Sequence, residues 1–329
     1  MKRLTAENVT AGLLFIFLIF YPLMASAYNV LNMSYFLSMV FLSLSLALIW
    51  GLAGIFSFGQ TAFFGIGGYS YAIISLNLDI PDITFIVLIS ALLIAGIAAW
   101  ILGYFIFYGG VNDVFVGLIT LCVTLVLATF MSQTAGSQWK IGSVPLGGDN
   151  GINNIPSISI GNIISFERNY LYYLILIVLV VVYLLLRKIS HSKSGYKLIA
   201  VRENRERSEL FGYNIPLIQT MVFTLGGVLA ALSGVFYVTW GGYISPSSMG
   251  ITAAALPVVL VAAAGRKNLT AVILFTIIYY MFSQYLSVTG SEYALVVLGF
   301  TLVVVILLVP QGVFASLFQL LDRLLFKKK

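Results

Sequence analysis

The amino-acid sequence predicts an all-α polytopic membrane protein that forms one transmembrane domain over residues 1–329. Three observations lead to this fold class. Hydrophobic residues make up 60% of the chain and charged residues only 9%. The hydrophobic residues form repeated runs of bilayer-spanning length, and the charges are gathered in a few short stretches between those runs. Such a composition excludes an ordinary soluble domain.

Ten apolar runs predict about ten transmembrane helices, because each approaches the roughly 20 residues that cross a bilayer. They cover residues 11–27, 33–53, 56–77, 83–107, 114–135, 169–188, 217–241, 250–265, 269–288 and 293–310. The runs 56–77 and 250–265 contain many Gly, Ala and polar residues, so one or both are candidates for broken or re-entrant segments. Ten crossings would place both termini on the same side of the membrane.

The distribution of positive charge orients the bundle. If both termini are cytoplasmic, all but Lys140 and Arg168 of the 17 Lys and Arg residues lie on the cytoplasmic side, as the positive-inside rule requires. This assignment makes residues 136–168 an outer loop and residues 189–215 a cytoplasmic loop. It also accounts for the net charge of +6 without a nucleic-acid partner.

The first apolar run has two interpretations. Lys2 and Arg3, the apolar residues that follow and the small residues Ala25–Ala27 resemble a signal peptide with its cleavage site. We favour a retained first helix, because another apolar run follows almost at once.

The stretch Gly51–Tyr71 is dense in glycine and contains Gln60, Thr61, Phe64 and Tyr69. Small residues allow helices to pack closely in lipid, and packing alone would explain the glycines. Alternatively, the helix lines a solute path, where the side chains of Gln60 and Thr61 form hydrogen bonds that lipid does not provide. We keep both interpretations. A second small-residue stripe, Gly226, Ala230 and Gly234, indicates helix packing.

The outer loop carries the run Gly147, Gly148, Asp149 and Asn150. No strand precedes this run and no Lys follows it, so it does not fit a phosphate-binding loop. Its residue types favour tight turns. The four charges of residues 136–168 sum to zero. We therefore expect a compact folded cap whose surface does not steer ions strongly.

The cytoplasmic loop contains a patterned charged stretch that predicts a short helix from Lys197 onward. Opposite charges lie four residues apart in three pairs, which are Arg202/Glu206, Glu203/Arg207 and Arg205/Glu209, and Gly212 is a suitable helix stop. Leu198, Ile199, Val201, Leu210 and Phe211 are expected to act as apolar anchors. One ordered cytoplasmic helix on a membrane protein indicates a docking site for a partner.

Several function classes are disfavoured by what the sequence lacks. It has no G-x-x-x-x-G-K-[ST] nucleotide loop and no H-E-x-x-H metal motif. No acidic or basic residue lies well inside a predicted span, although ion-coupled carriers usually need such groups. A single Cys (Cys122) and a single His (His191) do not supply a membrane enzyme with its reactive cluster. The remaining solutes are neutral or zwitterionic, and transport is either passive or driven by a partner.

Four segments match one known family. They are Gly51–Tyr69 (GLAGIFSFGQTAFFGIGGY), Gly147–Pro156 (GGDNGINNIP), Gly195–Asn214 (GYKLIAVRENRERSELFGYN) and Pro310–Gly312. In these segments the chain resembles the permease subunits of branched-chain amino acid ABC importers of the LivM type, which include urea-importer permeases. The cytoplasmic segment is the most specific of the four. One departure is Ala264–Asn268 (AGRKN), where the family usually has a GGxGT turn.

The resemblance implies a half-transporter in the bacterial inner membrane. Its partners would be a homologous LivH-type permease, two cytoplasmic ATPases that bind the ATP, and a periplasmic solute-binding protein that touches the outer loop. The chain itself would be no enzyme and would hold no cofactor. The helix Tyr196–Phe211 would be the coupling helix, seated in a cleft of one ATPase. The contact residues would be Arg202, Glu203, Asn204, Arg205, Glu206 and Leu210.

The solute is left open between two classes. Branched-chain amino acids are the family's main cargo, whereas residues 211–214 and Glu292 look somewhat like the branch that imports urea or short amides. A passive facilitator for a small neutral solute is a further alternative, but it would not explain the ordered charged helix.

Overall fold

The computed structural model describes residues 5–78, 80, 83–160, 164–290, 293–309 and 311–325. Glu292, Pro310, both basic N-terminal residues and Lys327–Lys329 therefore lie outside the described residues. The helices are α1 Ala6–Met24, α2 Ala27–Leu46, α3 Gln60–Leu78, α4 Thr84–Tyr108, α5 Asp113–Ser132, α6 Asn169–Ser190, α7 Lys193–Glu203, α8 Arg205–Leu210, α9 Ile215–Gly241, α10 Ile251–Ala264, α11 Leu269–Val288, α12 Ala294–Leu308 and α13 Val313–Leu325.

Short elements complete the fold. A π-helical segment, η1 (Ala47–Leu52), extends α2, and the 3₁₀ turns η3 (Gly148–Asn150) and η4 (Pro246–Met249) lie between longer elements. In the described part of the chain, six two-residue strands form three antiparallel pairs: β1 Lys140–Ile141 with β2 Val144–Pro145, β3 Ile152–Asn153 with β6 Tyr243–Ile244, and β4 Ser159–Ile160 with β5 Ile164–Ser165.

Each of the ten predicted spans coincides with a helix. Within the described residues, seven helices are long and apolar enough to cross a membrane, and an eighth span results if the bent pair Val296–Leu308 and Val313–Leu324 counts as one. The seven are α1, α2 with η1, α4, α5, α6, α9 and α11. The structure thus confirms an all-α polytopic membrane protein.

The two segments expected to be broken behave differently. α3 is continuous over 19 residues, and the irregular backbone precedes it at residues 53–59, where Gly54 has a positive φ of 78°. α10 is a short apolar helix of 14 residues with Pro257 inside it. The bend of 44° lies instead between α12 and α13.

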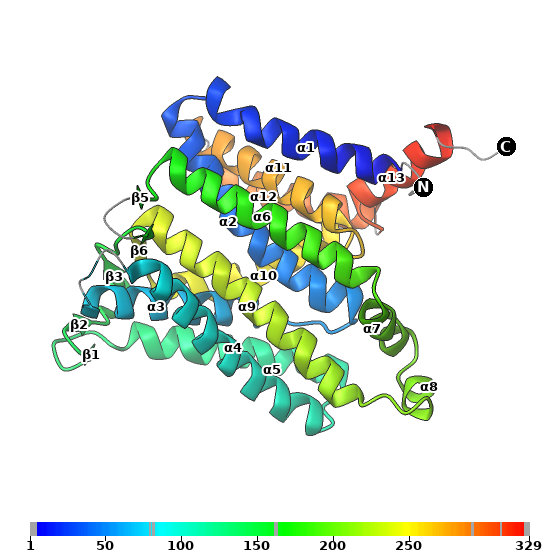
Figure 1. The fold of residues 1–329 in the computed structure, drawn as a ribbon, viewed down its shortest axis with the longest axis horizontal. Helices are drawn as coiled ribbons and strands as arrows, with labels where there is room; N and C mark the ends of the chain where they lie inside the picture. Colours follow the sequence, from blue (N-terminus) through cyan, green and yellow to red (C-terminus); the bar gives the residue numbers. More distant parts are fainter. Residues whose placement is uncertain are drawn as a thin grey trace.

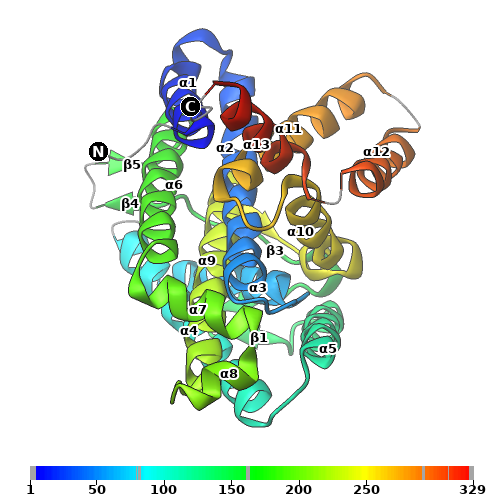
Figure 2. The same cartoon turned by 90° about the vertical axis from the view of Figure 1, so that its right-hand side faces the viewer.

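The long helices run side by side between two distinct ends (Figure 1). The strands β1–β6 gather at one end, and α7, α8, α13 and the start of α1 lie at the other. There the backbone N–H of Ala6 donates a hydrogen bond of 2.7 Å to Asp322 Oδ1. The view onto that end shows α7 and α8 projecting from the bundle, with α12 at its periphery (Figure 2).

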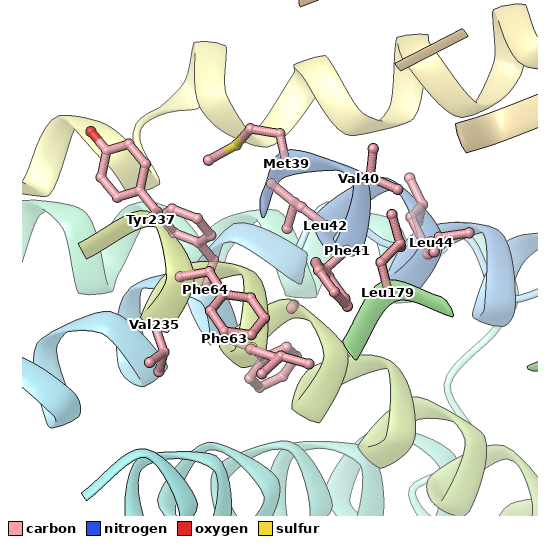
Figure 3. Close-up of a cluster of buried hydrophobic side chains, with 14 of the residues drawn as sticks. Met39, Val40, Phe41, Leu42, Leu44, Phe63, Phe64, Leu179, Val235 and Tyr237 are labelled. Atoms are coloured by element: carbon pink, nitrogen blue, oxygen red, sulfur yellow. The ribbon is translucent and has the colours of Figure 1, made fainter. Parts of the chain in front are cut away.

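α2, α3 and α9 form the centre of the bundle. In the most apolar stretch of α2 with η1, 89% of the residues are buried, against 11% in α1. α2 is therefore enclosed by protein. Small residues allow close packing here: a Cβ on Gly234 would collide with the carbonyl of Phe64, and one on Gly226 would meet Ile49. The predicted packing stripe of α9 is confirmed. Figure 3 shows the apolar core that these helices enclose.

Candidate functional site

Gln60 begins α3 and lies in the junction of α2, α3 and α9. Its side chain is buried, and its Oε1 accepts a hydrogen bond of 2.9 Å from Ser45 Oγ. A Cβ on Gly226 would lie 3.7 Å from the same Oε1, so α9 also packs against the Gln60 side chain. Gln60 Nε2 is buried and has no hydrogen-bond partner within the described residues.

Thr61 and Tyr69 occupy another face of α3. Their side chains are 1% and 5% exposed, and neither the Thr61 hydroxyl nor the Tyr69 hydroxyl has a partner in the described part of the chain. Leaving a buried polar group unsatisfied costs about 1–3 kcal/mol, so each such group calls for an explanation. Together with Gln60, they give α3 three polar side chains with unused hydrogen-bonding capacity.

Phe64 belongs to the apolar core instead. Its ring lies beside Tyr237 of α9, with ring centroids 5.4 Å apart (Figure 3). None of the four residues expected on a solute path lines the cavity at the α7–α8 end of the bundle or the cavity against α4. In this conformation the four residues are packed between helices.

The strand end of the bundle is closed by the predicted cap. Gly147 and Gly151 adopt positive φ values of 77° and 67° around η3, and they let the chain turn so that β3 pairs with β6, Ile152 opposite Ile244. Tyr71 Oη donates to the carbonyl of Pro156 at 3.1 Å. The expected compact fold is confirmed.

Asp149 and Asn150 are among the exposed residues of the cap. Gly148 is buried against Ala135, whereas Asp149 and Asn150 are exposed at the tip of η3. Asn77 of α3 fixes the neighbouring hairpin, since its Nδ2 donates to the carbonyl of Ile141 at 2.9 Å. The cap thus presents one polar tip on a framework tied to α3 and to β6.

The predicted helix Tyr196–Phe211 is wrong in one respect, because it is two helices. Asn204 has extended backbone angles (φ −158°, ψ 103°) between α7 and α8, and its Oδ1 accepts a hydrogen bond of 2.8 Å from the N–H of Arg207. Asn favours such N-cap positions over helix interiors, because its side chain competes for backbone groups. The N-cap at Asn204 therefore starts a new helix, α8, and the stretch does not form one continuous helix.

The break changes the charge pairs. Arg205 and Glu209 form the expected pair at 3.6 Å, but Arg202 pairs with its neighbour Glu203 at 2.6 Å. Within the described residues, neither Arg202/Glu206 nor Glu203/Arg207 comes within ion-pair distance. The hydrogen bond from Arg202, its positive charge and the charge of Lys267 lower the pKa of Glu203.

Arg202 also holds α7 to the bundle. Its Nη1 donates to the carbonyl of Gly51 at the end of η1, and its side chain is only 16% exposed. Gly54 leaves room for this contact, since a Cβ there would lie 2.6 Å from Arg202 Cγ. No sequence pattern indicated this link, because it joins segments about 150 residues apart.

The apolar residues of the charged stretch divide into two groups. Leu198 and Val201 are buried and anchor α7 as expected. Leu210 and Phe211 are 88% and 74% exposed, so they do not pack against the bundle. They form an apolar tip at the end of α8, which stops at Gly212 with its φ of 79° as predicted. We call Leu210 and Phe211 the α8 tip.

A cavity of about 740 Å³ opens at the same end of the bundle, between α1, η1, α10 and α13. It is lined by residues of both charges, among them Glu7, Arg266, Lys267 and Asp322. Arg266 lies over the ring of Trp50, 5.1 Å from its centroid. The cavity includes the turn where the sequence departs from the resembled pattern, but the pattern alone did not predict a cavity.

Comparisons with known proteins agree with this geometry. A family model described as the permease component of branched-chain amino acid transport systems matches residues 27–306. The chain is 22% identical over 297 residues to the high-affinity branched-chain amino acid transport system permease protein LivM of Salmonella typhimurium, covering 83% of this chain and 67% of that protein. LivM of Escherichia coli gives the same identity and coverage. No solved structure matches the chain.

Proposed function

Because this chain belongs to the family of permease components of branched-chain amino acid transport systems, we propose that it is the transmembrane subunit of an ABC importer. In this proposal it moves branched-chain amino acids, or a related small polar solute, into the cytoplasm across the bacterial inner membrane. The observation that carries the proposal is the family match, which extends from α2 into α12 and includes α7 and α8. The uncharged interior of the described spans suits a neutral or zwitterionic solute.

The same proposal assigns four partners. A second, homologous permease completes the transmembrane unit, two ATPases supply the energy, and a solute-binding protein delivers the cargo. The α8 tip supports an ATPase contact, because exposed apolar side chains on a water-facing element are stabilised by burial against a partner. The polar tip at Asp149 and Asn150 is the corresponding candidate for the binding protein.

Arg202 offers a route from the ATPase to the interior. It joins α7 to Gly51, and the irregular residues 53–59 lead from there directly to Gln60 at the start of α3. Movement of α7 by an ATPase would therefore be transmitted to the end of α3. This route uses contacts of the backbone and of one guanidinium group, and it needs no ionisable residue inside the membrane.

The affinity-tagged chain, purified from its own membranes in mild detergent, tests the proposal. We expect a second permease and an ATPase with a nucleotide-binding loop to copurify, and mass spectrometry identifies both. A chain that purifies without any ATPase and still equilibrates the solute would be a passive facilitator, which contradicts the proposal.

We further propose ten crossings with both termini cytoplasmic. Support comes from the position of the start of α1 and of α7, α8 and α13 at one end of the bundle (Figure 1) and from the positive charge at that end. The remaining helices of the ten runs, α3, α10 and α12, would complete the count.

Cysteine labelling of intact cells checks this topology. Cys122 is the single cysteine, so Cys122→Ser provides a background for Asp149→Cys and, separately, Glu206→Cys. Both replaced side chains are exposed. A membrane-impermeant maleimide is expected to label position 149 from outside and position 206 only after lysis. The reverse labelling order would invert the topology.

Gln60→Leu is expected to lower uptake while the protein still assembles. The substitution conserves most of the volume and removes both the bond to Ser45 and the unpaired Nε2, so we expect stability to change by about 1 kcal/mol or less. Gln219→Leu is the matched control, because Gln219 is also buried with an unpaired Oε1 but lies on α9. Equal uptake by both variants, measured at matched expression, would remove Gln60 from the solute path.

A further inference from the structure

Met249 occupies the middle of the α3 face that carries the two unpaired hydroxyls. It is the last residue of η4, is 2% exposed, and lies so close to Gly65 that a Cβ there would collide with its Sδ. Only glycine at position 65 admits the methionine side chain at this depth. η4 contacts α3, α5 and α10, so the side chain is enclosed on several sides.

Thr61 and Tyr69 lie on the same face as Gly65, one helical turn before it and one after it. The rise of about 1.5 Å per residue places each of them about 6 Å along the helix from Gly65. Their hydroxyls are the buried, unpartnered groups described above. The face therefore combines an apolar slot, filled by a thioether side chain, with an unsatisfied hydroxyl above and below it.

We propose that this face of α3 is a solute subsite and that Met249 fills it as a plug in the present conformation. The inference rests on the proposed transport function and specifies the solute chemistry. A branched aliphatic side chain has nearly the volume of the methionine side chain, so it fits the vacated slot. The Thr61 and Tyr69 hydroxyls would then bind the polar part of the solute.

The plug is built to move. Methionine is unbranched and flexible, and the segment 243–249 lies between Gly242, which has a φ of 67°, and Gly250. The same segment begins with β6, which pairs with β3 next to the exposed Asp149 and Asn150. A protein that docks on the cap thus acts on η4 through β3 and β6, and withdrawal of Met249 would open the subsite.

Passive influx tests the plug. The chain and its copurified partners are placed in vesicles without ATP and without binding protein, and entry of labelled leucine is measured. For Met249→Ala we expect about a 30-fold rise, which corresponds to about 2 kcal/mol of packing lost from the closed state. Met249→Leu conserves volume and should leak less. Met39→Ala, in the core of α2, is the control for packing loss and should not leak.

An influx through Met249→Ala equal to that of the wild type or of Met39→Ala would overturn the plug. ATP-driven uptake by the wild type in the same vesicles separates the two hypotheses. If the wild type accumulates leucine and Met249→Ala does not leak, the plug is wrong and the function stands. If the wild type accumulates no solute, the proposed function fails on its own measurement.

A second experiment tests the subsite in the leaky Met249→Ala variant. There the leucine concentration that gives half-maximal influx reports the affinity of the chain for leucine, because no binding protein is present. Thr61→Val and Tyr69→Phe keep the shape and remove one hydroxyl each. Each is expected to raise the half-saturating leucine concentration about tenfold, the effect of one lost hydrogen bond. Thr276→Val removes a buried, unpaired hydroxyl on α11 and is the control. An unchanged half-saturation in both α3 variants would overturn the subsite.

Discussion

Replacement of Leu210 and Phe211 by aspartate is expected to abolish ATP-driven uptake and to release the ATPase from the purified chain. The two side chains are 88% and 74% exposed, and full burial of each against a partner contributes about 1.5–3 kcal/mol. Loss of both contributions would weaken binding by at least about 100-fold. Copurification of the ATPase and uptake into vesicles are the two measurements.

Two further variants separate docking of the ATPase from transmission of its movement to the bundle. Leu210→Met with Phe211→Leu keeps the α8 tip apolar and should retain the ATPase. Arg202→Met breaks the hydrogen bond to Gly51 but leaves the α8 tip untouched, so we expect the ATPase to copurify while uptake falls. If the aspartate variant retains both the ATPase and normal uptake, the α8 tip is not the docking site.

Deletion of Gly147–Asn154 is expected to abolish uptake at low solute concentration while the ATPase stays bound. The deletion removes η3 and β3, and with them the pairing of Ile152 with Ile244 that connects the cap to η4. Without this surface the binding protein is expected to lose its docking site on the chain, so it no longer delivers solute when the solute is dilute. Uptake at limiting solute with the binding protein present is the measurement.

A milder variant keeps that experiment interpretable if the deletion disturbs folding. Asp149→Lys with Asn150→Lys changes only exposed side chains and leaves β3 and β6 paired. We expect about a tenfold loss of uptake at low solute from the altered charge at the contact, since charges at an interface rim mainly set the rate of association. Normal uptake by both variants would reduce the cap to a connection between α5 and α6.

The sequence predicted the helices well, because apolar length and composition govern what can cross a bilayer. It did not predict the break at Asn204. There the local competition of an Asn side chain for the N–H of Arg207 overrides a charge pattern that favours one helix. It also did not distinguish the exposed Leu210 and Phe211 from the buried Leu198 and Val201, since a sequence pattern shows that a residue is apolar but not whether protein or solvent covers it.

The interior was predictable only in part. Burial of Gln60 and Thr61 follows from their place in an apolar segment, whereas the neighbours of Gln60 belong to α2 and α9, and the pattern of α3 alone does not identify them. The glycines around position 65 indicated that another segment packs closely on α3. The residue that does so at Gly65 is Met249, which lies far along the chain. Contacts of this kind depend on the tertiary arrangement and not on a local pattern.

The central claim is that partner ATPases drive solute through this chain, and accumulation in sealed proteoliposomes tests it most directly. The chain, its copurified permease and ATPases, and the binding protein are combined, with ATP on the ATPase side and labelled leucine on the cap side. We expect leucine to accumulate above its outer concentration only when ATP, the binding protein and this chain are all present. Equilibration of leucine to equal concentrations, at the same rate with and without ATP, would contradict the account.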